Sequence, residues 1–250
     1  MNQRIWLIGG SSGIGLELLK IWLINHNHLI VSSRHASSDT MLNNLVEIYP
    51  DHLHLIDLDV SDQGAIATAV KEAWNVYDGL DLWFYNSGAY ETMKADEWKF
   101  EHFKNMNDVN YLGAVHLMTE LFPLFKSQGY GKWVLNLSLS AYIGLPYAGA
   151  YSAPKAALLN LAQSIQPELI KDNIEVQVIN HGFVKTRLTS KNDFEMPQLM
   201  KVEYTAKRII FELQRPYRFE INFPYKLALF LKILRVLPYK ISLALTKKAL

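Results

Sequence analysis

Short apolar segments of strand length alternate with longer segments of helical spacing along most of this chain. The strand-like segments are RIWLIGG (4–10), HLIVSSR (28–34), HLHLIDLDV (52–60), LDLWFYNSG (80–88), GKWVLNLSLS (131–140) and IEVQVINHG (174–182). Between them lie segments such as SGIGLELLKIWLINH (12–26), whose apolar residues recur at helical spacing. Strands that alternate with helices through short turns predict parallel strands joined by right-handed crossovers. The sequence therefore predicts one α/β domain, a doubly wound parallel sheet with helices on both faces.

The composition limits the class of protein. Half of the 250 residues are hydrophobic and a fifth are charged, which is typical of a globular domain with a substantial core. The net charge of +1 gives no reason to expect a nucleic-acid partner. The absence of cysteine excludes disulfides and thiolate catalysis, and the eight histidines lack metal-ligand spacing, so no metal site is predicted. The chain opens on a strand-like segment, and no uncharged apolar run reaches roughly 18 residues, which favours a cytoplasmic location.

A glycine-rich turn, IGGSSGIG at 8–15, connects the first strand to the first helix. Gly9, Gly13 and Gly15 allow the backbone to turn sharply and to approach a pyrophosphate closely. The helix that follows offers unpaired N–H groups and the positive end of its dipole. Tight strand–helix turns also use glycine for packing alone, but the position at the N-terminal strand–helix junction favours nucleotide binding.

The end of the second strand indicates the form of the nucleotide. An acidic residue there would accept hydrogen bonds from the ribose hydroxyls of NAD, but the sequence has Ser32, Ser33 and Arg34. No carboxylate follows before Asp39. An arginine can form a charge-assisted pair with the 2′-phosphate of NADP. The predicted cofactor is therefore NADP(H) rather than NAD, with a solvated surface arginine as the alternative for Arg34.

The segment YSAPK (151–155) carries a candidate proton donor. Tyr151 and Lys155 are four residues apart, so on a helix they share one face. A tyrosine hydroxyl has an ordinary pKa near 10, and a neighbouring cation lowers that pKa by stabilising the phenolate. Such a pair suits proton exchange with a carbonyl oxygen, although a match of this kind also arises by chance.

Two parts of the sequence together resemble the short-chain dehydrogenase/reductase (SDR) family. Gly9-x-x-x-Gly13-Ile14-Gly15 is similar to the family's glycine motif. NLSLSAYIGLPYAGAYSAPKAAL (136–158) resembles its Asn-Ile-Ser-Ser … Tyr-x-Ala-Ser-Lys-Ala-Ala block over the whole length. The resemblance covers about residues 4 to 190. It implies a single Rossmann-like fold and an NAD(P)-dependent oxidoreductase that acts on CH–OH or carbonyl groups.

The resemblance also implies a role for each matched residue. Tyr151 would be the acid/base, Lys155 would lower its pKa and bind the nicotinamide ribose, and Ser138 would polarise the carbonyl, with Ser140 as the alternative. Asn110, in DVNYLGAVHL, would kink its helix and hold a water bonded to the lysine, which supports a proton relay. The residues implied to bind the cofactor are Gly9, Ser11, Ser12, Gly13, Ile14, Gly15, Arg34, Asp59, Val60, Asn86, Gly88, Tyr151, Lys155, Val184 and Thr186.

The chain departs from the family pattern at a few positions. Ile8 replaces a threonine, Tyr85 and Ser87 replace an asparagine and an alanine in YNSG, and His181 replaces a proline in HGFVKTRL. We interpret His181 as a solvent-facing side chain rather than a second catalytic group, because neither a second carboxylate nor a metal-ligand spacing accompanies it.

The predicted function is NADP(H)-dependent reduction of a ketone or aldehyde, or the reverse oxidation of an alcohol. A dinucleotide-binding regulatory or scaffold protein on the same fold is the alternative, although such a protein usually lacks the tyrosine or the lysine. The family resemblance implies a homodimer or a homotetramer. Residues that flank the site suggest an apolar substrate, with ordinary packing as the alternative role, and they are Tyr90, Tyr142, Tyr147, Phe183 and Leu188.

The end of the chain differs from the rest. We assign residues 1–224 to the catalytic domain and residues 225–250 to an apolar helical extension that carries six basic residues and no acidic one. In the favoured interpretation, a helical stripe packs over the substrate cleft or against a second subunit, and Pro238 ends that helix. The stripe consists of Leu227, Phe230, Leu231 and Leu234. In the other interpretation, two short amphipathic helices lie on an anionic membrane.

Overall fold

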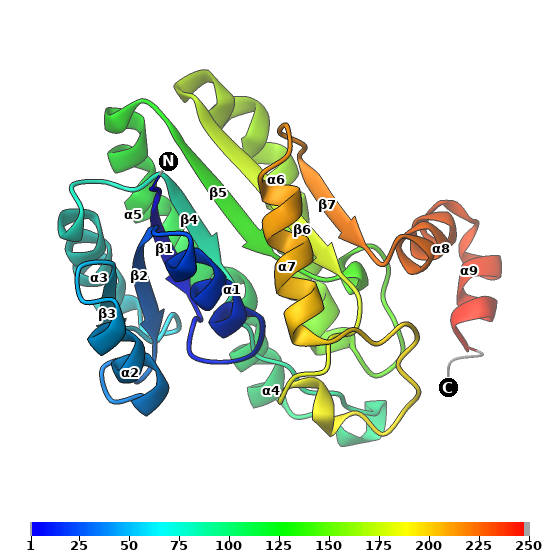
Figure 1. The fold of residues 1–250 in the computed structure, drawn as a ribbon. Coiled ribbons are helices and arrows are strands. Elements are labelled where there is room, and N and C mark those ends of the chain that lie inside the picture. The colour runs from blue at the N-terminus through cyan, green and yellow to red at the C-terminus, as the bar shows by residue number, and fades with distance from the viewer. Residues whose placement is uncertain (1, 248–250) are drawn as a thin grey trace.

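The computed structural model describes residues 2–247, in which seven parallel strands form one sheet (Figure 1). The strand order is β3–β2–β1–β4–β5–β6–β7. From β1 the chain continues to β2 and β3 on one side and then crosses to β4 on the other, so the order reverses between β1 and β4. The strands are β1 (Arg4–Ile8), β2 (His28–Ser33), β3 (Leu53–Asp57), β4 (Leu82–Tyr85), β5 (Gly131–Asn136), β6 (Ile174–His181) and β7 (Glu220–Phe223).

Helices cover both faces of this sheet (Figure 1). Residues of β1 alternate between the two cores, with Ile5 and Leu7 on one face and Trp6 and Ile8 on the other. The first core is completed by α1 (Gly13–Ile24), α2 (Thr40–Ile48) and α7 (Val202–Leu213). The second core is completed by α3 (Gln63–Val76), α5 (Gly113–Gln128) and α6 (Gly149–Leu169), and α4 (Phe100–Asn107) packs against α6. The predicted doubly wound α/β fold is confirmed.

The sheet extends one strand beyond the segments that the sequence pattern indicated. β7 has only four residues, of which Ile221 and Phe223 are buried while Glu220 and Asn222 are half-buried. It pairs with β6 alone and therefore forms an edge. A strand this short, with polar residues at alternate positions, gives a weak signal in a sequence.

The C-terminal segment packs onto the sheet through its first helix. α8 (Tyr225–Val236) buries Ala228, Leu231 and Leu234 in the same core as α5 and α6. The helix ends just before Pro238, as predicted, and α9 (Tyr239–Thr246) follows. Within residues 2–247, no helix combines the length and the apolar character that crossing a membrane would require.

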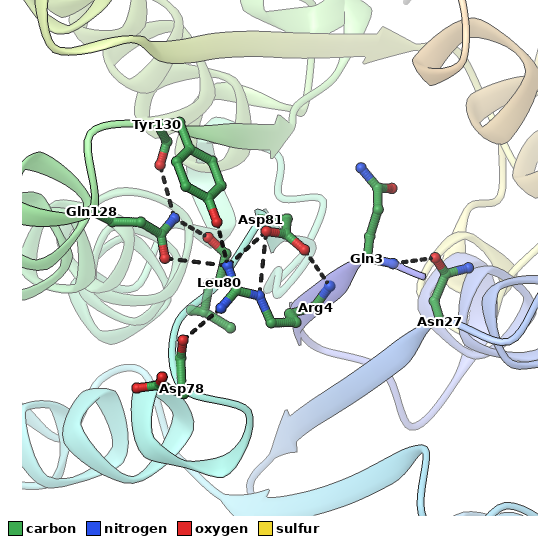
Figure 2. A network of polar contacts seen from close by, with 8 residues as sticks. All are labelled: Gln3, Arg4, Asn27, Asp78, Leu80, Asp81, Gln128 and Tyr130. Carbon is green, nitrogen blue, oxygen red and sulfur yellow. Dashed lines mark hydrogen bonds and ion pairs between the residues drawn. The ribbon is translucent and has the colours of Figure 1, made fainter. Parts of the chain in front are cut away.

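A polar network joins the amino end of β1 to the segments before β4 and β5 (Figure 2). Arg4 Nη2 donates to Asp81 Oδ1 at 2.8 Å and to the Tyr130 hydroxyl at 2.7 Å. Arg4 Nη1 donates to the backbone oxygen of Asp78 at 2.5 Å, and the Arg4 backbone N–H donates to Asp81 Oδ2 at 2.8 Å. These bonds fix the amino ends of neighbouring strands, at the edge of the sheet opposite to their carboxyl ends.

We expect Asp81→Asn to lower the free energy of unfolding at pH 7 by about 1–3 kcal/mol, because Arg4 loses its charged partner. Burial raises the pKa of Asp81, but the hydrogen bonds and charge of Arg4 outweigh it and hold the pKa below its ordinary value of 3.8. A carboxyl group whose pKa is lower in the folded than in the unfolded protein stabilises the fold at pH values above its unfolded-state pKa. This stability is lost as the pH falls through the folded-state pKa.

Urea unfolding of both proteins at pH 7 and under acid conditions measures this difference, which we expect to shrink in acid. Asp78→Asn is the matched control, because Asp78 accepts the bond from Arg4 with its backbone oxygen and not with its carboxylate. Equal stability of Asp81→Asn and the unsubstituted protein at pH 7 would contradict the assignment.

Candidate active site

A cleft of about 1050 Å³ follows the carboxyl ends of the strands. In a doubly wound sheet, ligands bind in the crevice at these ends, where the strand order reverses. The fold brings into this cleft residues that are far apart in the sequence. They include Ser11 after β1, Arg34 after β2, Asp59 after β3, Asn86 after β4, Ser138 after β5 and His181 at the end of β6.

The turn between β1 and α1 is packed so closely that two positions require glycine. Gly9 has φ +87°, and a Cβ atom there would lie 2.8 Å from the backbone nitrogen of Ser87. A Cβ atom on Gly15 would lie 2.0 Å from the carbonyl oxygen of Gly9. Asn86 Nδ2 donates to the same oxygen at 2.7 Å. Contacts beneath the turn therefore fix its shape.

The amino end of α1 lies at the cleft. Its N-cap residue, Ser12, makes no side-chain capping hydrogen bond, and the first turn carries no acidic residue. Ser11, Ser12, Gly13 and Ile14 line the cleft here. The unpaired N–H groups and the positive end of the helix dipole attract an anion. The glycine turn and this helix end therefore fit the pyrophosphate of a dinucleotide.

Arg34 follows β2, the neighbour of β1, and its exposed side chain lines the cleft. It forms no ion pair with any residue in the described range 2–247. Burial raises the pKa of nearby Asp59, whereas hydrogen bonds from Ser61 and the Arg34 charge lower it, and the result is a pKa below the ordinary value. The guanidinium is therefore available to an anionic group of a ligand.

A series of hydrogen bonds connects the glycine turn to Lys155. Asn86, which holds the oxygen of Gly9, accepts at Oδ1 from Asn136 Nδ2 at 2.7 Å. The backbone oxygen of Asn136 accepts from Lys155 Nζ at 3.0 Å. Lys155 is only 3% exposed, and burial lowers the pKa of its ammonium group to about 8. The lysine is thus held in place from the strand side of the cleft.

Tyr151 lies on the same helix, with its ring centroid 5.8 Å from Lys155 Nζ. Burial raises the pKa of the Tyr151 hydroxyl, and a hydrogen bond with Ser138 acts in the opposite direction. Ser138 Oγ also accepts from the backbone nitrogen and the hydroxyl of Ser140, at 3.2 and 3.0 Å. The Tyr–Lys spacing predicted a lowered tyrosine pKa, but the pKa is raised instead, because desolvation of the hydroxyl dominates.

Asn110 lies behind the cleft in a π-helical turn, Asp108–Leu112, between α4 and α5. Its side chain is fully buried and pairs with the backbone of Ala89, accepting from N–H at 2.9 Å and donating to the carbonyl at 2.8 Å. A Cβ atom on Gly88 would lie 3.3 Å from Asn110 Oδ1 and 4.0 Å from Lys155 Nζ. The predicted irregularity of this helix is present, and Asn110 and Lys155 converge at Gly88.

His181 lines the cleft and is half-buried, so its interpretation as a solvent-facing side chain is wrong. Its Nδ1 lies 2.8 Å from the backbone oxygen of Gly182, and its ring lies against Phe223 with the centroids 6.4 Å apart. Burial, together with the charge of Lys155, lowers the pKa of the imidazole to about 4. His181 is therefore neutral at pH 7.

Aromatic and aliphatic side chains form part of the cleft wall. The Tyr90 ring meets the Tyr151 ring edge to face, with the centroids 4.9 Å apart. Tyr142 was expected here but lies outside the cleft, where it is buried and its hydroxyl donates to the Glu220 carboxylate. Other residues of this wall are Tyr147, Phe183, Leu188 and Phe194, with Leu227, Phe230 and Leu231 from α8.

The sequence matches the family model described as short chain dehydrogenase over residues 3–196. The chain belongs to the short-chain dehydrogenase family. It is 30% identical to an uncharacterized oxidoreductase of Myxococcus xanthus, over 95% of this chain and 94% of that protein. It is 28% identical to an uncharacterized oxidoreductase of Staphylococcus haemolyticus, over 89% of this chain and 96% of that protein.

The fold agrees with this assignment. A short chain dehydrogenase from Burkholderia cenocepacia, solved in complex with NADP, has a TM-score of 0.83 to this chain at 20% sequence identity. The match covers 100% of this chain and 98% of that one. As a short-chain dehydrogenase, the protein is an NAD(P)-dependent oxidoreductase.

The residues that the SDR resemblance implicated converge on this cleft, with two lying behind its surface. Gly15 supports the glycine turn from below, and Asn110 supports Gly88 and Ala89. The remaining implicated residues line the cleft itself, and they are Gly9, Ser11, Ser12, Gly13, Ile14, Arg34, Asp59, Val60, Asn86, Gly88, Ser138, Tyr151, Lys155, Val184 and Thr186.

Sequence reasoning missed one part of this short-chain dehydrogenase site. Asn136 connects Asn86 to Lys155, and a polar residue at the end of a buried strand was the signal for it. The α8 wall agrees with the favoured interpretation of the C-terminal stripe, because Leu227, Phe230 and Leu231 line the cleft. The contacts of α8 with β7 were not predicted, since the sequence pattern did not reveal that strand.

We expect Gly15→Ala to weaken NADPH binding on the order of tenfold or more. The new methyl group would lie 2.0 Å from the Gly9 oxygen, so the turn has to shift away from its anion-binding shape. Fluorescence titration with NADPH measures the effect. Gly64→Ala, where the nearest atom to a Cβ lies at 3.4 Å, is the control and should bind as the unsubstituted protein does. Unchanged binding by Gly15→Ala would contradict the role given to this turn.

Proposed function

We propose that this short-chain dehydrogenase catalyses NADP(H)-dependent reduction of a ketone or aldehyde, or the reverse oxidation of an alcohol. The observation that supports this best is the pairing of Tyr151 with a buried Lys155 at a dinucleotide-sized cleft. NADP(H) would supply or accept the hydride. The glycine turn, the amino end of α1 and Arg34 would hold its phosphates, and Asp59 and Val60 would border its adenine.

In the direction of reduction, the carbonyl oxygen acquires a proton from the Tyr151 hydroxyl. The Ser138 hydroxyl hydrogen-bonds the same oxygen and stabilises the negative charge that develops on it. The pKa of Tyr151 is raised by burial, so the tyrosine is protonated at pH 7 and ready to donate. The hydroxyl therefore carries the proton that a general acid donates, but the raised pKa makes the donation harder unless the phenolate is stabilised.

Lys155 stabilises the phenolate that remains after the proton has left. With a pKa of about 8, its ammonium group is mostly charged at pH 7, and the carbonyl of Asn136 orients it. Burial makes the charge act more strongly on its neighbours because little water screens it. Asn110 positions the backbone of Ala89 beside this pair and thereby supports the path of the proton.

We expect Tyr151→Phe to reduce kcat by about 10²–10⁴-fold, because the ring remains and the exchangeable proton is lost. Its dissociation constant for NADPH should stay close to that of the unsubstituted protein. Oxidation of NADPH with a panel of ketones and aldehydes gives the rate. Turnover by the variant at the original rate would reject Tyr151 as the acid. Binding of NADPH without turnover of any carbonyl by the unsubstituted protein would favour the regulatory or scaffold alternative.

Arg34 should set the preference for NADP(H) over NAD(H). A charge-assisted pair with the 2′-phosphate contributes about 1.5–3 kcal/mol, so Arg34→Ala should bind NADPH about 10–100-fold more weakly. Binding of NADH, which lacks this phosphate, should change little. Titrating both proteins with both nucleotides measures the four dissociation constants. Equal affinity of the unsubstituted protein for NADPH and NADH would reject the preference.

The substrate that fits the cleft best is an apolar carbonyl compound. Tyr90, Phe183 and Phe230 are among the aromatic side chains that line it, and Tyr90 contacts Tyr151 directly. Assembly as a homodimer or homotetramer and a cytoplasmic location stay predictions from the sequence.

A further inference from the structure

The last helix, α9, is reversed in polarity compared with a helix on a water-facing surface. Its buried side chains are Ser242 and Thr246, which are 1% and 8% exposed. Ile241, Leu243 and Leu245 are instead exposed by 47%, 60% and 38%. A helix that turns hydroxyl groups inward and aliphatic side chains outward is suited to an apolar environment on its outer side.

α8 also carries exposed aliphatic side chains. Leu229, Ile233 and Val236 follow one another at four- and three-residue spacing, so they share one face of the helix, and all three are exposed. Figure 1 shows α8 and α9 beyond β7, at the end of the sheet away from β3. We call the exposed aliphatic side chains of α8 and α9 together the C-terminal face, and they are Leu229, Ile233, Val236, Ile241, Leu243 and Leu245.

The charged residues within the segment that carries the C-terminal face are all basic. Residues 225–247 contain Lys226, Lys232, Arg235, Lys240 and Lys247 and no acidic residue. In the described part of the chain, Lys232 pairs with Glu220, while the other four form no ion pair. Cations beside exposed aliphatic side chains are characteristic of helices that lie at an anionic lipid interface.

We propose that the C-terminal face docks on an anionic lipid surface. The aliphatic side chains of α8 and α9 enter the boundary between headgroups and acyl chains, and the unpaired cations contact the negatively charged headgroups. A second copy of the chain matches this surface less well. A two-fold contact through it would place a segment with only cations against the same segment.

The docked helix is also a wall of the active-site cleft. Leu227, Phe230 and Leu231 of α8 line the cleft, and Phe230 is in addition exposed. Docking through α8 therefore brings the apolar part of the cleft next to the lipid. This step rests on the proposed function and assigns its substrate class, namely a lipophilic aldehyde or ketone dissolved in the membrane.

Sedimentation with vesicles tests the docking without any catalytic step. We expect the full chain, loaded with NADPH, to sediment with vesicles of phosphatidylcholine and phosphatidylserine, and far less with phosphatidylcholine alone. High salt should release it, because salt screens the attraction between the cations and the headgroups. If the folded protein stays in the supernatant with the anionic vesicles, the proposal is overturned.

Two variants identify the surface that binds. Leu229→Gln/Ile233→Gln should weaken binding to the anionic vesicles about tenfold or more, since two aliphatic side chains no longer enter the lipid. Ile24→Gln/Ile48→Gln changes two exposed isoleucines on α1 and α2 and should bind as the unsubstituted protein does. NADPH titration confirms that each variant is folded. Equal losses in both variants would overturn the proposal. It would also be overturned if the unsubstituted protein is a dimer that does not bind the vesicles and Leu229→Gln/Ile233→Gln dissociates this dimer.

Turnover of two aldehydes tests the substrate class. With a long-chain aldehyde in anionic vesicles, Leu229→Gln/Ile233→Gln should be slower than the unsubstituted protein by the factor found for vesicle binding. With a short, water-soluble aldehyde the two should have equal rates. Equal rates on the vesicle-borne aldehyde would overturn the assigned substrate class. If the unsubstituted protein reduces neither aldehyde, the proposed function fails, while vesicle binding still decides the docking.

Discussion

The position of the proposed catalytic groups depends on one series of hydrogen bonds across the middle of the sheet. It runs from the carbonyl of Gly9 through the side chain of Asn86 to Asn136, and from the backbone of Asn136 to Lys155. These residues follow or end β1, β4 and β5, which are neighbours in the sheet, and the last lies on α6. The register of three parallel strands thus determines how far the glycine turn lies from the lysine, and the two linked amide side chains keep that distance constant.

The sequence predicted the parts of this arrangement that local patterns encode. The alternation of apolar strands with helices determined the parallel sheet, because each crossover has to bury one face of a helix. Close backbone contact determined the glycine turn, since Gly15 has no room for a side chain. Helical spacing placed Tyr151 and Lys155 on one face, and the structure keeps their side chains close together.

Other parts depend on contacts between distant segments, and the sequence pattern did not reveal them. β7 forms as an edge strand only because β6 offers a partner, and its four residues carry little signal of their own. Tyr142 was predicted to flank the substrate, but its hydroxyl donates to Glu220 of β7 and the side chain lies outside the cleft. His181 was predicted to face solvent, but its ring packs against Phe223 of β7. The pKa of Tyr151 reflects burial, which no spacing of residues encodes.

The residues proposed to carry out the chemistry and the helix that shapes the space for the substrate lie in different parts of the chain. The groups proposed to contact the dinucleotide and the carbonyl come from the chain between β1 and the segment after β6, whereas α8 forms its part of the cleft wall after the last strand. No crossover to another strand follows α8 within the described residues. Substitutions or insertions in α8 can therefore reshape the space for the substrate without moving the register of the sheet. The C-terminal end is thus the segment in which a duplicated gene for this protein could diverge in substrate most readily while its chemistry stays the same.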